Sequence, residues 1–385
     1  MLKLPQDFID SVNRALPSNE VDDLILAIQE SPKVSIRLNA SKGITSNGFL
    51  NDTLGSPIAH CPDGYLLNTR PLFTADPAFH AGAYYVQEAN SMMIGELVKR
   101  IINNYDEGAV VLDLCASPGG KSTHVATNLR AGDLLVANEV ISGRCNTLIE
   151  NLCKWGQGNH VVTSADAKQL GELQGLFQII VADMPCSGEG MFRKTPDAIG
   201  EWSLSNVDLC TDRQKRIAHD IWPSLAEGGV MIYSTCTYNR CENEDNVNYI
   251  AIELGANIVE FDFPESLGII EIEHKLNASQ DSGHETTSTI SSELGELERD
   301  INLERTMVPA VVHHIKSHDP DIIRLKKGYP YTKDLLERID SEGNIYDQTK
   351  TDFGTILKKK TPIPDKAKRI ISHIKSKLRL NNNKK

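Results

Sequence analysis

The 385-residue chain lacks the sequence features that mark several large classes of protein. Its eight cysteines form no Cys-x-x-Cys pair, so their spacing indicates neither a zinc site nor a disulfide framework. No apolar run approaches the ~20 residues of a membrane-spanning helix, and the first residues show no secretory leader pattern. We therefore expect a cytoplasmic protein with reduced thiols, no metal ion and no contact with a membrane.

Phosphate-binding glycine patterns are also missing. Residues 110–122, VVLDLCASPGGKS, run from apolar residues through Asp113 into a Pro-Gly-Gly turn, which predicts a strand, a turn and a helix start. Gly-Gly-Lys-Ser resembles the end of a P-loop, but Cys115 stands where a P-loop needs its first glycine, and the turn does not fit G-x-G-x-x-G. Open α/β sheets bind cofactors at such turns, although an ordinary strand-to-helix turn would look the same.

After residue 110, strands alternate with helices, which predicts a doubly wound parallel sheet of the α/β class. Four expected strands finish on acids that would share one rim of the sheet, namely Asp113, Glu139, Asp166 and Asp183. Glu139 follows Asp113 by 26 residues, near the ~20 expected for an acid that binds ribose hydroxyl groups. Two acids near a ribose and an adenine, without a phosphate cradle, favour a cationic cofactor, S-adenosylmethionine. Lys121 would then face the substrate side, or else be a surface lysine.

The length of the chain predicts two or three domains. Amphipathic patterns within residues 5–30 and an alternating strand at 33–39 predict a small N-terminal α+β RNA-binding unit over residues 1–75. Its Arg37 and Lys42 stand near an exposed strand end, which suits either RNA contact or a solvated edge. We expect a Rossmann-like domain at 76–325, with a flexible acidic insert at about 275–305, and a divergent basic segment at 326–385.

The net charge of −12 is unevenly distributed. Residues 351–385 hold 11 lysines and arginines against Asp352 and Asp365, whereas the rest of the chain is acidic. This tail is either an electrostatic arm for a nucleic-acid backbone or a solvated end.

Two cysteines in polar motifs carry the expected chemistry. Cys186 lies in DMPCSGEG directly after a buried strand, and Cys236 lies in YSTCTYNRC at the end of the next one, so both thiols should reach the cofactor rim. Carbon 5 of a pyrimidine is a poor nucleophile until a thiolate adds at carbon 6, and a carboxyl such as Asp183 can draw charge to ring nitrogen 3. The second thiol, or a base that it positions, can serve the release of product. The residues alone do not decide which cysteine attacks.

Several aromatic side chains have two interpretations. A base must leave its stack to be attacked at carbon 6, and Phe192 or Tyr238 could stack on it, or could simply pack in the core. Tyr84, Tyr85 and Gln87 lie in a polar, aromatic stretch before the cofactor turn, where they suit cofactor or substrate contact as well as packing.

The motifs DLCASPGGKS, DMPCSGEGMFRK, NVDLCTDRQKRIAHDIWPSLAEGG and YSTCTYNRCENEDNV resemble the Sun-type family of RNA cytosine-C5 methyltransferases. SIRLN and DPAFHAGAYYVQEANSM are similar to its bacterial 16S rRNA branch, the RsmF-like proteins. The resemblance covers about residues 33–262. The family's usual pattern for the last strands of the sheet, and its usual C-terminal RNA-binding domain, are not recognisable after residue 263.

The resemblance implies a role for each matching residue. Cys236 would be the nucleophile, Cys186 would aid release of the methylated RNA, and Asp183 would contact the reacting base. Glu139 would bind the ribose, and Asp166 would lie near the adenine. The remaining residues implied to border the cofactor or active site are Cys115, Ala116, Ser117, Pro118, Gly119, Gly120, Lys121 and Arg144.

The sequence therefore predicts a Rossmann-like enzyme that uses S-adenosylmethionine to methylate carbon 5 of a cytosine in 16S rRNA. RNA is the expected partner, with the small ribosomal subunit as the larger assembly. Two alternatives stay open: a tRNA cytosine as the target, and a non-catalytic RNA-binding factor in ribosome assembly. The intact pair of thiols favours an enzyme, because a binding module has no need of both.

Overall fold

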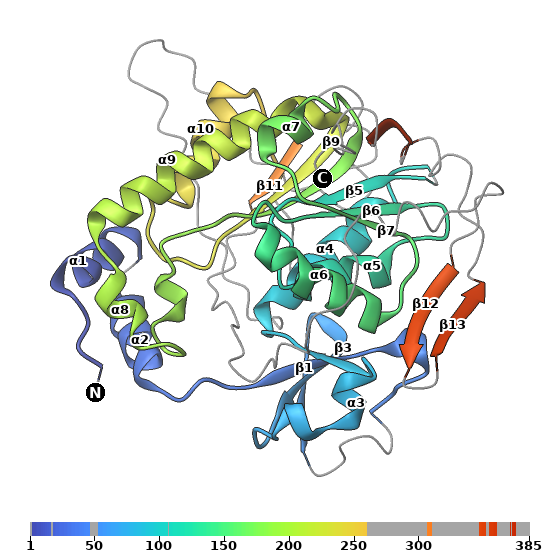
Figure 1. The fold of residues 1–385 in the computed structure, drawn as a ribbon. Helices are drawn as coiled ribbons and strands as arrows, with labels where there is room; N and C mark the ends of the chain where they lie inside the picture. The colour runs from blue at the N-terminus through green and yellow to red at the C-terminus, as the bar shows by residue number, and fades with distance from the viewer. Residues whose placement is uncertain are drawn as a thin grey trace.

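The computed structural model describes residues 2–16, 18–46, 53–106 and 108–259, together with residues 306–309, 346–351, 354–359, 370 and 372–374. A seven-stranded sheet with helices on both faces forms the larger part, and a four-stranded sheet lies beside it (Figure 1).

The central sheet is parallel at every pairing of its described strands. In spatial order these are β10 (Asn257–Ile258), β11 (Thr306–Pro309), β9 (Leu225–Ser234), β8 (Phe177–Asp183), β5 (Val110–Asp113), β6 (Leu134–Asn138) and β7 (His160–Thr163). The four strands expected to end near acids are β5 to β8, so the predicted doubly wound sheet is confirmed. The strand order reverses between β5 and β8, and open α/β sheets bind ligands beyond the carboxyl ends of strands at such a reversal.

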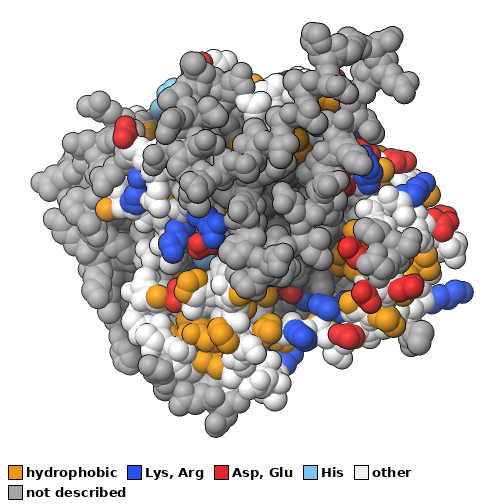
Figure 2. All heavy atoms as spheres, turned by 180° about the vertical axis from the view of Figure 1, so that it is seen from behind, with side chains coloured by type: hydrophobic (Ala, Val, Ile, Leu, Met, Phe, Trp, Pro, Cys, Tyr) orange, Lys and Arg blue, Asp and Glu red, His pale blue; other side chains and the backbone are white. Residues whose placement is uncertain are grey.

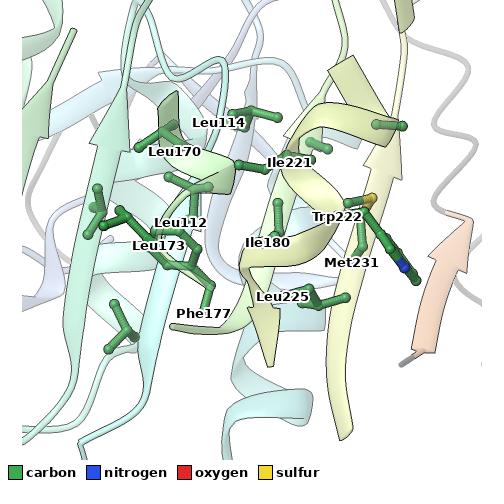
Figure 3. Packing of buried hydrophobic residues seen from close by; sticks show 14 of the residues in the cluster. Leu112, Leu114, Leu170, Leu173, Phe177, Ile180, Ile221, Trp222, Leu225 and Met231 are labelled. Atoms are coloured by element: carbon green, nitrogen blue, oxygen red, sulfur yellow. The ribbon is translucent and has the colours of Figure 1, made fainter. Parts of the chain in front are cut away.

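Helices cover both faces of this sheet. One face carries α4 (Met93–Ile102), α5 (Gly120–Asn128) and α6 (Ser142–Trp155), and the other carries α7 (Ala167–Gly171), α9 (Leu204–Ile221) and α10 (Glu244–Glu253). Alternate residues of a strand point to opposite faces, so Val111 packs on the first set of helices and Leu112 on the second. Figure 3 shows the second cluster, with Leu170 and Ile221 on the helical side. Burial on both faces explains why these strands are continuous apolar runs.

The N-terminal region contributes two helices and a separate sheet. The helices are α1 (Gln6–Ala15) and α2 (Ser18–Gln29), and the sheet is antiparallel in the order β2 (Leu54–Ile58), β3 (Cys61–Leu67), β1 (Ser35–Leu38) and β4 (Tyr84–Val86). These elements agree with the helices and strand expected within residues 5–39. In Figure 1, α1 and α2 lie beside α8 (Ala198–Glu201) and α9 at the left, whereas β1 and β3 lie at the bottom, below α5 and α6.

The remaining described elements are short. They are α3 (Pro77–His80), the 3-10 helices η1 (Ala40–Lys42), η2 (Phe73–Ala75), η3 (Asn90–Met92), η4 (Glu189–Met191) and η5 (Trp222–Ser224), and the hairpin strands β12 (Tyr346–Thr351) and β13 (Gly354–Lys359). The expected insert at 275–305 and most of the basic tail lie outside the described residues.

The placement expected for Arg37 is wrong. β1 pairs with β3 on one side and with β4 on the other, so it is an inner strand rather than an edge. The Arg37 side chain is 1% exposed and can reach neither RNA nor solvent. Lys42 is exposed, and its Nζ donates to the main-chain oxygens of Ala81 and Lys154, both at 2.6 Å.

Within the described residues, no helix combines the length and apolar character needed to cross a membrane. The same part of the chain holds no group of three or more His, Cys, Asp or Glu side chains arranged to bind a metal ion.

One part of the C-terminal segment docks on the core. Residues 370 and 372–374 are helical, and Ile374 is 1% exposed within the cluster beneath α7, α9 and α10. Ile370 packs against the same cluster. The tail therefore has a fixed apolar contact, in addition to its positive charge.

We expect Ile374→Ala to lower the free energy of unfolding by about 2–5 kcal/mol, because it removes a fully buried side chain and leaves a cavity. Urea unfolding followed by circular dichroism measures the change. Ser372→Ala, at an exposed position two residues away, is the matched control and should stay within about 0.5 kcal/mol of the parent. Equal stability of the two variants would show that the segment does not dock.

Candidate active site

The expected cofactor turn connects β5 to α5. Gly119 has a φ of +112°, a conformation that strains any residue with a Cβ, and α5 begins at Gly120. Asp113, at the end of β5, is fully buried, and its Oδ2 accepts a 2.6 Å hydrogen bond from the Ser122 hydroxyl. Its Oδ1 has no hydrogen-bond partner among the described residues. Burial raises the pKa of Asp113 to about 7.

Asn138, which the sequence analysis did not single out, holds the loops of this rim together. Its side-chain amide donates to the main-chain oxygens of Leu114 and Ala165, each at 3.0 Å. Its Oδ1 accepts from the Thr163 hydroxyl at 2.8 Å, and its main-chain oxygen accepts from the Ala116 N–H at 2.8 Å. One buried amide thus joins the segments that follow β5, β6 and β7. The sequence feature that could have identified Asn138 is its position at the end of an apolar strand, directly before the acid Glu139.

Glu139, Arg144 and Ser117 come together beside the turn. Glu139 is 2% exposed and accepts a 2.9 Å hydrogen bond from the Ile141 N–H. Arg144 Nη1 lies 3.4 Å from Glu139 Oε2, and Nη2 of the same side chain donates to the Ser117 main-chain oxygen at 2.7 Å. The arginine therefore links the rim acid to the turn.

Asp166 has a different setting. Its side chain is exposed, and its Oδ1 caps α7 by accepting from the Gln169 N–H at 2.8 Å. The expected contact with an adenine ring stays a prediction.

The two thiols meet at the same rim. Cys186 follows β8 and Cys236 follows β9, and their Sγ atoms are 3.0 Å apart. The main-chain N–H of Cys236 donates to Cys186 Sγ at 3.4 Å. Cys236 is 5% exposed and Cys186 is half-buried. The adjoining hydroxyl oxygens of Ser187 and Thr237 are 3.1 Å apart, so the two motif loops stay in contact beyond the thiols.

An ion pair connects the cofactor turn to these loops. Lys121 Nζ lies 3.0 Å from Asp183 Oδ2, and the two side chains are 18% and 9% exposed. The Ser234 hydroxyl donates to Asp183 Oδ1 at 3.1 Å. Lys121 is therefore directed toward the end of β8 rather than outward as a surface lysine.

Two buried acids that the sequence analysis did not single out support the thiol loops. Glu189 is 1% exposed and accepts from the Asn239 N–H at 3.0 Å. Glu242 accepts from the Ser187 N–H at 2.9 Å, from Asn239 Nδ2 at 2.7 Å and from Gln214 Nε2 at 2.8 Å. Burial raises the pKa of Glu242 above its ordinary value. Glu189 stands three residues after Cys186, and Glu242 stands six residues after Cys236, so their closeness to the motif cysteines was visible in the sequence.

Phe192, Tyr238 and Tyr84 serve packing. Phe192 is fully buried, with its ring centroid 5.0 Å from that of Phe8 on α1, and Tyr238 belongs to the same cluster. Phe192 has no face free to stack on a base. Tyr84 is 1% exposed and donates a 2.6 Å hydrogen bond to Asp76, so it also belongs to the core.

Two family models match the chain. Residues 100–275 match 16S rRNA methyltransferase RsmB/F, and residues 4–89 match the N-terminal domain of 16S rRNA methyltransferase RsmF. The chain belongs to the RsmB/F family. The resemblance inferred from the motifs is thereby confirmed.

Curated relatives in the RsmB/F family agree with this assignment. Ribosomal RNA small subunit methyltransferase F of Serratia proteamaculans is 34% identical over 262 residues, which cover 66% of this chain and 54% of the relative. The protein of the same name from Pectobacterium atrosepticum is 35% identical over 254 residues, 63% of this chain and 51% of the relative. The chain thus spans about half the length of the curated relatives it matches.

Solved structures show the fold. NSun6 from Pyrococcus horikoshii, solved with SFG, has a TM-score of 0.56 and 20% identity over 67% of this chain and 90% of that one. A methyltransferase homolog protein from the same organism has a TM-score of 0.51 and 24% identity over 64% of this chain and 82% of that one. The predicted Rossmann-like methyltransferase sheet with a small N-terminal α+β region is confirmed.

The raised pKa of Asp113 predicts a pH dependence of stability. Between the unfolded value of 3.8 and the folded value of about 7, the folded protein holds a proton that the unfolded chain releases. This group's contribution to stability is therefore lost as the pH rises through that window. Asp113→Asn cannot ionise, so the parent should lose stability relative to the variant between about pH 4 and pH 7, and the difference should level off above that range. Thermal unfolding of both proteins measures the difference, and parallel pH profiles would contradict it.

Proposed function

We propose that the chain is an enzyme that uses S-adenosylmethionine to methylate carbon 5 of a cytosine in 16S rRNA through a covalent cysteine adduct. The observation that carries the proposal is the contact of the two motif thiols, 3.0 Å apart, at the rim where the strand order reverses. The Lys121–Asp183 ion pair joins this rim to the cofactor turn.

The cofactor turn suits a cationic cofactor. The buried Oδ1 of Asp113 lacks a partner among the described residues, and the carboxylates of Glu139 and Asp183 belong to the same rim. Acids of this kind attract a sulfonium and can accept hydrogen bonds from ribose hydroxyls, whereas they repel phosphate. We propose that residues 115–121, Glu139, Arg144, Asp166 and Asp183 hold S-adenosylmethionine, which supplies an electrophilic methyl group when bound.

The chain's own residues prepare the cytosine for transfer. The Cys236 thiolate adds to carbon 6, which makes carbon 5 nucleophilic. The carboxyl group of Asp183 donates a proton or a hydrogen bond to ring nitrogen 3, which neutralises the negative charge that the addition places on the ring. Lys121 holds Asp183 in place from the cofactor side. The assignment of Cys236 as the attacking thiol follows the family motif, because the 3.0 Å distance between the two sulfurs does not distinguish the nucleophile.

Cys186 lies beside the proposed nucleophile and takes the release step. After transfer, the proton on carbon 5 must leave, and the bond between Cys236 and carbon 6 must break. A thiol 3.0 Å from the nucleophile can assist this elimination directly, or by holding the base that takes the proton.

The proposed substrate is RNA, and the proposed larger partner is the small ribosomal subunit, because the relatives are named for ribosomal RNA of that subunit. On the face that Figure 2 shows, the Lys and Arg side chains of the described residues lie beside Asp and Glu side chains instead of forming one basic patch. In the sequence, the main concentration of positive charge is residues 351–385, which hold 11 lysines and arginines against two aspartates. The division into 1–75, 76–325 and 326–385 also stays a proposal.

The function is tested by bisulfite sequencing of 16S rRNA and tRNA from cells with and without the gene. We expect one cytosine of 16S rRNA to lose its protection, and a plasmid copy of the gene to restore it. Cys236→Ser should fail to restore protection because it removes the nucleophile, whereas Cys153→Ser, at an exposed thiol on α6, should succeed. Loss of protection at a cytosine in tRNA alone would identify tRNA as the substrate. No loss of protection in either RNA would favour a non-catalytic RNA-binding factor.

Cys186→Ala should accumulate a covalent protein–RNA adduct, because addition and transfer proceed while release is blocked. The adduct appears as a band of reduced mobility that survives denaturing gel electrophoresis and disappears with ribonuclease. The double variant Cys186→Ala/Cys236→Ser is the matched control and should give no such band. A single variant that turns over normally would remove Cys186 from the release step.

A further inference from the structure

The SIRLN segment, residues 35–39, lies on the N-terminal sheet, far in sequence from both catalytic motifs. Arg37 is 1% exposed, yet none of the described carboxylates forms an ion pair with it. Its Nε donates to Gln87 Oε1 at 2.8 Å and its Nη2 donates to Thr123 Oγ1 at 2.7 Å. Its Cζ lies 4.2 Å from the ring centroid of Trp155. One guanidinium group therefore joins β1 to α5 and α6.

The bonds of Arg37 continue into the cofactor turn. Thr123 Oγ1, which accepts from Arg37, donates in turn to the main-chain oxygen of Gly120 at 3.0 Å. The Thr123 N–H also donates to the Gly119 oxygen at 2.8 Å. Arg37 is thus two hydrogen bonds from the backbone of the turn.

A second connection reaches the same turn from β4. Asn151 on α6 donates from Nδ2 to the Pro118 main-chain oxygen at 2.8 Å and to the Tyr85 hydroxyl at 3.3 Å. A Cβ placed on Gly120 would lie 3.3 Å from Tyr85 Cε1, so the tyrosine ring packs directly on the turn. Both connections start on the N-terminal sheet and end on residues 118–120.

The end of α6 is attached to the sheet as well. Asn39 is fully buried, and its Nδ2 donates to the main-chain oxygens of Gly82 and Trp155, both at 2.9 Å. This bond keeps Trp155 beneath the Arg37 guanidinium.

The cost of burying Arg37 favours a geometric role over a stabilising one. Burial lowers the pKa of Arg37 to about 10, so the side chain stays charged at neutral pH while its hydrogen-bond partners are neutral. Removing a cation from water is unfavourable unless it is compensated, and apolar side chains would join two surfaces more readily. Apolar residues cannot replace the planar guanidinium group, which hydrogen-bonds to Gln87 and Thr123 and stacks on Trp155 at the same time.

We propose that Arg37 and Tyr85 are positioning residues that hold the backbone of residues 118–120 in the conformation that binds the cofactor. The proposal rests on the proposed function, because the turn is assigned there to S-adenosylmethionine. Neither residue touches the reacting atoms. Each acts through a hydrogen bond to Thr123 or Asn151.

Arg37→Lys keeps the charge but removes the fork, since one ammonium group cannot occupy the positions of Nε, Nη2 and the plane over Trp155. We expect the dissociation constant for S-adenosylmethionine, measured by calorimetry on the full chain, to rise about 10-fold, as for the loss of one charge-assisted hydrogen bond. The dissociation constant for 16S rRNA should change less than about 2-fold. Tyr85→Phe, a milder change that keeps the ring on Gly120, should weaken cofactor binding less and leave the fold intact.

Arg70→Lys is the matched control. Arg70 also belongs to the N-terminal region and lies over an aromatic ring, with its Cζ 5.6 Å from the Phe73 centroid, but that ring belongs to the N-terminal cluster. It should bind S-adenosylmethionine as the parent does. Hydrogen exchange of the amides of residues 119–123, measured without cofactor, should be faster in Arg37→Lys and unchanged in Arg70→Lys.

The outcomes separate the two proposals. A parent chain that does not bind S-adenosylmethionine overturns the proposed function. A parent that binds it while Arg37→Lys and Tyr85→Phe bind it equally well overturns the positioning role. Equal weakening of cofactor and RNA binding, together with a lower unfolding temperature, also overturns it, because the residue would then serve only general stability.

Discussion

The parallel pairing of β8 with β9 is the constraint on which the site depends. Its register sets Asp183 opposite Ser234, so both motif loops leave the sheet at the same level. Cys186 follows the last residue of β8 by three positions, and Cys236 follows that of β9 by two. The thiols consequently emerge side by side. A slip of one residue in this register would turn the side chains of β9 to the opposite face of the sheet and separate the two loops.

The same rim concentrates negative charge. Five of its acids are buried, namely Asp113, Glu139, Asp183, Glu189 and Glu242. Buried carboxylates need donors or cations, and they obtain them in different ways. Those in the thiol loops accept from backbone and amide N–H groups and so hold the loops in shape, whereas Asp183 has the ammonium group of Lys121. Asp113 keeps an oxygen without a partner among the described residues, which leaves the cofactor turn as the place where a further positive group is most favourable.

Local pattern predicted those parts of the molecule that depend on neighbours in the chain. The strands β5 to β8 are continuous apolar runs because helices cover both faces of the sheet, and the two cysteines could be placed on one rim because both follow such strands. The burial of Arg37 could not be read in this way. Charged residues are rarely buried without a charged partner, and its acceptor Thr123 is 86 residues away. Glu189 and Glu242 likewise resemble loop acids until the two motif loops are brought together. Strand β11, which begins at Thr306, also belongs to the sheet, and no local sequence pattern predicted it.

The first 90 residues support the site from two sides. α1 and α2 pack on Phe192 and Trp202, next to the loop that carries Cys186, while β1 and β4 contact α5 and α6 beside the cofactor turn. An independent binding module joined by a linker would contribute few buried contacts to its neighbour. Here both the N-terminal helices and the N-terminal sheet make buried contacts with the rest of the molecule. Glu88 adds an ion pair with Lys194, which follows the Cys186 loop in the sequence. The N-terminal region therefore packs against both the loop that carries Cys186 and the helices that follow the cofactor turn. If Arg37 positions that turn as proposed, a movement of the N-terminal sheet would be transmitted to the turn through it.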